Sequence, residues 1–384
     1  LAELGEGTTA GAEGEIPYDF VPSKTHAFAD LYGPDGQFAT IDYGDEVPVG
    51  TMGWQVTLDE IGMAGLKSAE REAKTVASKK VSCPQCGGAL ELRAPDETQR
   101  VGCQYCSAML DCNHGNLEYL STLKSRVNPL IELGSKGTLF DVEYTLIGFM
   151  QRSVSFDRKY YWTEYLLYNP TVGFRWLIDA DSHWSFAEPI SPGDMHDYKT
   201  SAVWDGKTFK LFQRALAKVE YVMGEFYWKV EIGEEVAARD LICPPYSISI
   251  ERSVSAGMAP AAENAKGKQK LNLGEVNMTL ATYVPHADIE AAFGVTELPR
   301  SWQVAPNQPS PVDTKVFLNW LLFGVAGLVI YFGAAAISTE ADGWLLVWYM
   351  FLISILPIIG LIVNHTFNVK RWSESDYSPY ASSD

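Results

Sequence analysis

The sequence is poor in cysteine and in basic residues, and both shortages restrict what the protein can be. Six cysteines in 384 residues are too few for a secreted scaffold held together by disulfides, and no segment has the pattern of a secretory signal. Lysine and arginine total 30 against 48 aspartates and glutamates. Residues 1–60 contain twelve acidic side chains and one basic one, Lys24. Because phosphates are bound by clustered basic side chains, we expect no nucleic-acid partner.

The familiar catalytic motifs are also missing. The sequence contains no nucleophile elbow, no phosphate-binding loop, no H-E-x-x-H pair and no glycine run of the dinucleotide-binding type. Each of these motifs places a reactive group or a cofactor by means of a fixed local geometry. Without them the sequence indicates neither a reaction nor a substrate, so we expect no enzymatic activity while leaving the question open.

Two cysteine pairs organise the first half of the chain. The intervals read C-x2-C, sixteen residues, C-x2-C, with Cys83 and Cys86 in CPQC and Cys103 and Cys106 in CQYC. This spacing is typical of a zinc ribbon. A segment of this size buries too little apolar surface to fold alone, and structural zinc supplies about 10–16 kcal/mol in small modules. Four thiolates leave no open ligand position, so we predict a structural Zn²⁺, with two disulfides as the alternative in an oxidising compartment.

Three further residues could complicate this assignment. Cys112 and His114 follow the second pair closely enough to replace a ligand, but we interpret both as bystanders. Cys243, in LICPP, has no neighbouring cysteine and is interpreted as a small buried residue.

Composition and turn signals divide the rest of the chain. Leu117 to Arg126 is expected to be a short helix that Pro129 ends. Because Leu1 is not an initiator methionine, we expect the chain to be a piece or a processed product of a longer protein. The predicted segments are a disordered stretch (1–15), a partial β module (16–66), a charged helical linker (67–80), the zinc ribbon (81–116), a β module (130–254), short elements with a Pro-rich tether (255–315), two transmembrane helices (316–337 and 344–363) and a tail (364–384).

The β module is predicted from side chains that alternate with a period of two. In KVEYVM the apolar Val219, Tyr221 and Met223 face one way, while Lys218 and Glu220 face the other. The phase then slips at Gly224-Glu225, which predicts a β-bulge or a very tight turn. The pattern indicates eight or more antiparallel strands. The fold class is therefore mainly β, with an antiparallel barrel or sandwich, a zinc ribbon and a C-terminal two-helix transmembrane hairpin.

Polar residues inside the β module are the only enzyme candidates. Glu164, His183, Glu225 and Asp240 could meet inside a barrel, where carboxylates and an imidazole could transfer protons or hold a ligand. The alternative is a structural role, in which the carboxylates accept backbone N–H bonds and the histidine packs beside Trp184. We favour the structural role, so no residue is assigned as catalytic or cofactor-binding.

Two charge-free segments predict the membrane hairpin. Residues 316–337 and 344–363 are 22 and 20 residues long, which as helices match the hydrocarbon thickness of a bilayer. Lys315 precedes the first segment, Lys370 and Arg371 follow the second, and an acidic STEADG turn separates them. By the positive-inside rule, both ends of the hairpin are expected in the cytoplasm. Reduced, metal-binding thiols agree with that compartment.

Several motifs resemble one known family. IELGSKGTLFDVEYTLIGFMQRSV, YYWTEYLLYNPTVGFRWL, SHWSFAEPI, VMGEFYWKVEIGE and LICPPYSISIE together look like the bacterial domain of unknown function 4178. FADLYGPDGQFATIDYGDEVPVGTMGWQVTL resembles the tail of a second, truncated copy. Proteins of this family are similar in placing a CxxC zinc ribbon between two copies. The resemblance implies a bacterial protein, and with the hairpin an inner-membrane location, but it implies no activity.

These observations leave three hypotheses for function. The first is a scaffold or interaction protein that is embedded in the membrane and holds protein partners at its cytoplasmic face. The second is a β module that binds, or acts on, a small-molecule or lipid-linked ligand through Glu164, His183 and Glu225. The third is an accessory subunit of a membrane or envelope-stress complex. We favour the first, because a closed metal site and missing catalytic motifs both fit it.

Overall fold

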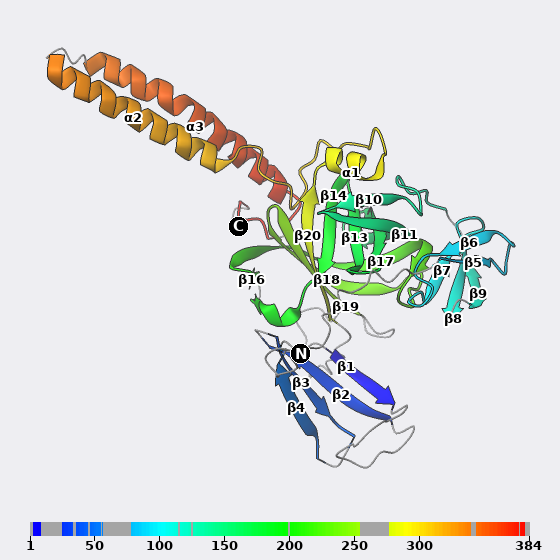
Figure 1. Cartoon of the computed structure of the whole chain (residues 1–384). Helices are drawn as coiled ribbons and strands as arrows, with labels where there is room; N and C mark the ends of the chain where they lie inside the picture. The colour runs from blue at the N-terminus through cyan, green and yellow to red at the C-terminus, as the bar shows by residue number, and fades with distance from the viewer. Residues whose placement is uncertain are drawn as a thin grey trace, which may run out of the picture. The chain divides into compact units, whose positions relative to one another are not determined.

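The computed structural model describes most of the chain. The described residues are 3–8, 25–33, 36–44, 47–54, 56, 78–113, 116–123, 126–198, 200–253, 276–338, 343–375 and 377–380. They belong to two compact units, residues 1–301 and 302–384. The first unit is built almost entirely of strands and the second of two long helices (Figure 1). The mainly β fold class is thus confirmed.

A closed barrel forms the centre of the first unit. Eight strands pair in an unbroken antiparallel ring, because β11 bonds to β12 on one side and to β17 on the other. Of the two predicted architectures, the structure is therefore a barrel. Its strands, in the order of pairing, are β11 (Val142–Ser155), β12 (Lys159–Asn169), β13 (Gly173–Ala180), β14 (His183–Pro189), β20 (Val276–Val284), β19 (Tyr246–Ser253), β18 (Glu235–Cys243) and β17 (Lys207–Phe226).

The register identifies which side chains face the inside of the barrel. Arg152 of β11 contacts Glu251 of β19, although these strands are three positions apart around the ring. A side-chain contact over that separation crosses the barrel interior. Residues paired with, or two positions from, an inward-facing residue also face inward. The inner face therefore includes Glu164 of β12, which is paired with Met150, and Asp240 of β18. Adjacent residues such as Tyr165 and Leu241 point outward.

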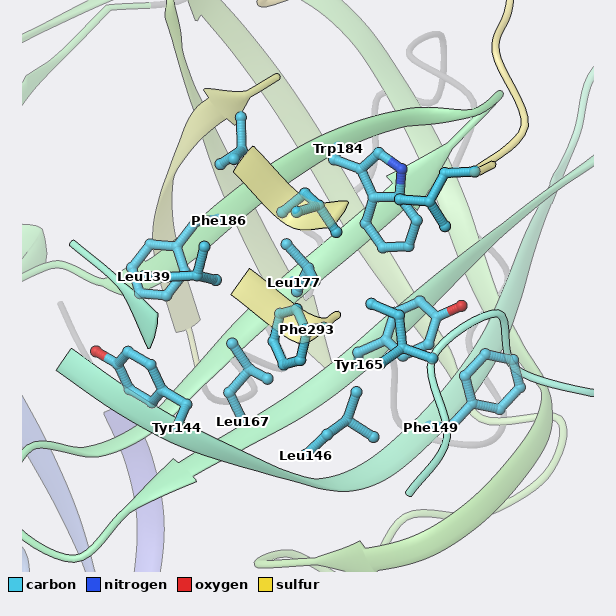
Figure 2. Packing of buried hydrophobic residues seen from close by; sticks show 14 of the residues in the cluster. Leu139, Tyr144, Leu146, Phe149, Tyr165, Leu167, Leu177, Trp184, Phe186 and Phe293 are labelled. Carbon is cyan, nitrogen blue, oxygen red and sulfur yellow. The ribbon is translucent and has the colours of Figure 1, made fainter. Parts of the chain in front are cut away.

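Hydrophobic residues fill one end of the interior and cover parts of the outside. Inside, Met150, Leu166 and Val222 pack with Phe226. Outside, the largest cluster surrounds α1 (His286–Phe293), and Figure 2 shows Leu177, Leu167 and other outward-facing side chains gathered around Phe293. This helix lies within 255–315, where short elements were expected, and it covers the outer face of the barrel. A second outer cluster includes Met195 and Ala202 of the small hairpin β15 (Met195–Asp197) and β16 (Ser201–Trp204), which follows the 3-10 turn η1 (Pro192–Asp194).

The ribbon strands continue the barrel sheet. At Gly224, β17 pairs with β11 on one edge and with β7 (Arg100–Gly102) on the other, and β7 in turn pairs with β8 (Ala108–Asn113). Gly224 has φ 84°, and a Cβ there would lie 2.2 Å from the carbonyl oxygen of Ile147. The predicted slip at Gly224-Glu225 is not found, because the register shift in this part of β17 lies at Glu220, between the pairs Gln151–Tyr221 and Arg152–Val219, and Gly224 lies within a continuous strand. Gly224 marks the point where this strand passes from the barrel to the ribbon.

Two predictions near the ribbon are wrong. Leu117 to Arg126 is not a helix, because Asn116–Thr122 form β9, which pairs with β8. The pairing of a whole strand outweighs the weak helical preference of that segment. The β module also extends beyond 130–254, because β20 and α1 come from 255–315, where short elements and a Pro-rich tether were expected. The remaining strands are β5 (Lys79–Ser82) and β6 (Ala89–Leu92), which pair with each other in the ribbon region, and β10 (Lys136–Leu139), which pairs with β11.

The N-terminal segment forms a separate sheet of four antiparallel strands. These are β1 (Glu3–Thr8), β2 (Thr25–Tyr32), β3 (Gln37–Asp42) and β4 (Val49–Trp54). The strands within 16–66 agree with the predicted partial β module. Within 1–15, however, Glu3–Thr8 pair with β2 instead of being disordered, because backbone pairing does not require apolar side chains. Most of the predicted linker, residues 67–77, lies outside the described residues, and Lys79 and Lys80 belong to β5.

The second unit is a helical hairpin. It consists of α2 (Thr314–Ser338) and α3 (Gly343–Trp372), both long and apolar enough to span a membrane. The helices pack through small residues, since Gly324 faces Ile353 and the indole of Trp320 donates to the Ile353 carbonyl oxygen at 2.9 Å. The predicted spans are confirmed as helices. The second helix continues nine residues past Val363, where Asn364 exchanges hydrogen bonds with the backbone of Val312.

Substitution of Gly224 by alanine tests the junction between barrel and ribbon. Gly224→Ala adds a Cβ at a positive φ and against the Ile147 carbonyl. We expect the free energy of unfolding, measured by urea titration of the full chain in detergent, to fall by about 3 kcal/mol or more.

Gly206→Ala is the matched control. Gly206 also has positive φ, 67°, but no atom lies within 4 Å of its added Cβ. Only the backbone penalty of about 1–2 kcal/mol is expected there. Equal losses in the two variants would contradict a crowded junction.

Candidate metal centre and polar sites of the barrel

The four cysteines of the two CxxC motifs form one cluster. Each pair lies in a turn, the first between β5 and β6 and the second between β7 and β8. Backbone N–H groups of Gly87 and Ser107 donate to the carbonyl oxygens of Cys83 and Cys103, and these bonds close the two turns. The sulfur atoms of all four cysteines lie within 4.8 Å of one another. The structure therefore brings together the full predicted ligand set.

The spacing of the sulfur atoms fits a tetrahedral metal site. Cys83 Sγ lies 3.8 Å from Cys106 Sγ, and Cys86 Sγ lies 3.9 Å from Cys103 Sγ. A zinc–sulfur bond of about 2.3 Å with tetrahedral angles places neighbouring sulfurs about 3.8 Å apart. None of the cysteines is disulfide-bonded, and sulfurs at this spacing are too distant for such a bond. The donor set is compatible with a metal ion and suits a soft, thiolate-binding one.

Local electrostatics distinguish the four thiols. The backbone N–H of Gly88 lowers the pKa of Cys86, whereas burial raises the pKa of Cys103 to about 12. A buried thiol of this kind becomes a ligand only when a cation compensates its negative charge. Cys112 is buried in β8 and is not a member of the cluster, which agrees with its role as a bystander. His114 lies outside the described residues.

Glu225 joins the ribbon to the barrel. Its carboxylate, only 2% exposed, accepts hydrogen bonds from the backbone N–H of Arg93 at 2.8 Å, from that of Ala94 at 3.0 Å and from the Thr98 hydroxyl at 3.0 Å. Burial raises the pKa of Glu225, and the two N–H groups oppose this effect. All its donors belong to the turn after β6. Glu225 thus has the structural role that the sequence favoured.

A cavity between ribbon and barrel offers no obvious catalytic group. It has a volume of about 290 Å³, and its lining includes Glu225, Arg93, Lys80 and Tyr105. The carboxylate of Glu225 is already bonded to the ribbon backbone, and the guanidinium of Arg93 pairs with Glu91 at 2.9 Å. The ionic groups of Glu225 and Arg93 are therefore both engaged by other parts of the structure.

A second group of charged residues lies inside the barrel. Arg152 Nη1 donates to Glu251 Oε1 at 2.7 Å and to Glu164 Oε1 at 3.2 Å, and the Trp162 indole donates to the same oxygen of Glu164 at 2.7 Å. Burial raises the pKa of Glu164, with Arg152 acting in the opposite direction. Burial would lower the pKa of Arg152, but Glu164 and Glu251 together raise it. Sequence analysis found Glu164 but missed Arg152 and Glu251, because a contact between distant strands leaves no local signal.

The remaining candidates are distributed along the same interior. Asp240 accepts a hydrogen bond from Gln213 at 2.8 Å, and burial raises its pKa. Asp240 and Glu251 lie on paired strands, two residues out of register, so they are diagonal neighbours. His183 Nδ1 lies 3.2 Å from the hydroxyl of Tyr283. The structure therefore groups Glu164 with Asp240, through Arg152 and Glu251, and separates both from Glu225.

Removal of two cysteines tests the metal site. A Cys83→Ser, Cys103→Ser double variant loses half of the ligand set, so we expect bound metal to fall from about one ion per chain to none, with a loss of stability. Metal content of the purified full chain is measured by atomic spectrometry, together with the thermal midpoint.

Cys243→Ser serves as the control, because Cys243 lies in the barrel outside the cluster. It should retain the metal. Metal-free protein with undiminished stability would contradict a structural metal centre.

Comparison with known proteins identifies a domain family for the barrel region but no activity. Neither the curated proteins nor the solved structures include a match. Residues 132–259 match the model of a domain of unknown function (DUF4178). The matched segment begins just before β10 and includes seven of the eight barrel strands, from β11 to β19. Residues 132–259 therefore form a domain of the DUF4178 family.

Proposed function

We propose that the protein is a membrane-anchored scaffold that recruits a protein partner through its ribbon. The observation that carries the proposal is the free edge of β9. This strand ends the fourteen-stranded sheet, and among the described residues no strand pairs with its outer side. The proposal adds that the anchor lies in the inner membrane of a bacterium with both ends of the hairpin in the cytoplasm.

The anchor follows from the composition and exposure of the second unit. Most of the apolar side chains of α2 and α3 are exposed, including Phe323, Ile330 and Trp348. In water such a surface would aggregate, whereas in a bilayer it is stable. The basic residues Lys315, Lys370 and Arg371 lie at the same end of the hairpin, which supports the cytoplasmic orientation.

The edge of β9 supports recruitment of a partner. An exposed strand edge presents unpaired backbone groups, and proteins without a partner for it usually protect it with charge, proline or a bulge. From Asn116 to Thr122 the strand contains one charged residue, no proline and one register shift, at Leu120, and it exposes Tyr119 and Leu120. An extended segment of another protein can extend the sheet there, with backbone bonds giving affinity and apolar side chains giving specificity.

The hydrogen bonds already made by the buried carboxylates favour a scaffold role over a catalytic one. Glu225 is held by the ribbon backbone, and Glu164 by Arg152 and Trp162. A general acid or base needs contact with its substrate, so neither carboxylate is placed for that task as it stands. The acidic surface of the chain, with a net charge of −18, favours partners with a basic segment.

Crosslinking in the native membrane tests the proposal. We expect one or more protein partners to be recovered in stoichiometric amount with the full chain and lost with Leu120→Lys, because lysine on a free edge opposes strand addition. The partners are identified by mass spectrometry.

Leu130→Lys is the control for surface charge. Leu130 is exposed to a similar degree as Leu120, 45% against 47%, but lies outside the strands. It should keep the partner. Recovery of the same partners with Leu120→Lys, or of none with the unmodified chain, would contradict recruitment through β9.

A further inference from the structure

The charges inside the barrel do not balance. Arg152 is the only cation in a contact group that contains Glu164 and Glu251, and Asp240 is their close neighbour. In the described part of the interior, two carboxylates thus contact one guanidinium and a third, Asp240, is the diagonal neighbour of Glu251. Buried carboxylates are costly unless each is paired or protonated. Burial raises the pKa of both Glu164 and Asp240, which is the response expected where compensation is incomplete.

The geometry of the cluster leaves parts of it available. Glu164 receives two donors on one oxygen, whereas Glu251 receives only Arg152, and its side chain is 28% exposed. Arg152 is more than nine-tenths buried, and its Nε has no hydrogen-bond partner in the described residues. A buried donor without an acceptor, beside a carboxylate with spare acceptor capacity, is an arrangement that a polar molecule can complete.

The inner face beyond the cluster is lined by small side chains. The register places alanines and serines on six of the eight strands there, in contrast with the bulky residues at the ribbon end. Five of them keep partial exposure to solvent although they face inward, which shows that the side chains do not fill this part of the interior. They are Ser185, Ala215, Ala238, Ser247 and Ser249.

We propose that the barrel interior binds a small organic cation, an amine or a guanidinium, beside Glu251 and Asp240. Arg152 is a positioning residue that holds Glu164 and Glu251 and offers its Nε to an acceptor group of the ligand. The cation supplies the positive charge that the cluster lacks. This binding does not involve the β9 edge, so it goes beyond the scaffold role. An experiment can disprove cation binding without disproving recruitment through β9.

The indole N–H of Trp162 reports on the site directly, because it bonds to Glu164 within the cluster. The full chain in detergent, labelled with ¹⁵N-tryptophan, is titrated with n-butylammonium chloride, and Trp162→Phe identifies the Trp162 signal. Sodium butanoate, n-butanol and potassium chloride are the matched anionic, neutral and inorganic probes. We expect a saturable shift of the Trp162 signal with butylammonium alone.

Two variants in the interior and one outside complete the test. Glu251→Gln and Asp240→Asn remove charge from the site, and each should weaken butylammonium binding at least tenfold. Glu188→Gln is the control, since Glu188 lies on the outer face and pairs with Arg175. It should leave binding unchanged, and thermal midpoints check that each variant folds.

Four results would overturn the proposal. They are an absence of saturable shift with butylammonium, an equal shift with butanol or butanoate, an equal shift with potassium, and unchanged affinity in both interior variants. An equal shift with butanol would indicate an apolar site, and an equal shift with potassium a non-selective ion cluster.

Discussion

Glu225 accepts three hydrogen bonds from the ribbon while its own strand forms the barrel wall, and the architecture of the first unit depends on this contact. One residue earlier, Gly224 is paired with β11 on one edge of β17 and with β7 of the ribbon on the other. The two residues act together. Glycine permits the close backbone approach, and the carboxylate satisfies the donors of the ribbon turn, which would otherwise be buried without acceptors. The small module that contains the four-cysteine cluster thereby becomes part of a barrel sheet.

The side chains that fill the barrel interior change in character along its length. Toward the ribbon, bulky side chains such as Leu166 and Phe226 pack densely, as in an ordinary core. Farther along, charged and small residues replace them. A buried ionic group is rarely the most stable filling for a core, because desolvation offsets much of the attraction between the charges. Its presence here is therefore better explained by binding than by stability.

Much of the fold could be predicted from the sequence, because its signals are local. The CxxC spacing predicted all four members of the sulfur cluster, and the long apolar segments predicted both helices of the hairpin. Long-range pairing has no such signal. The closure of β11 on β17, the eighth strand from beyond residue 275 and the contact of Arg152 with Glu251 each join residues far apart in the chain. Leu117–Arg126 was predicted as a helix for the same reason, since only the neighbouring β8 makes it a strand.

Native-state hydrogen exchange in increasing urea tests most directly whether ribbon and barrel form one cooperative unit. If they do, amides of β7 and β8 will merge with those of β11 and β17 into a single unfolding transition, and Glu225→Gln will separate the two sets. Ribbon amides that open at much lower urea than the barrel in the unmodified protein would contradict this account. The ribbon would then be an independent module that merely contacts the barrel.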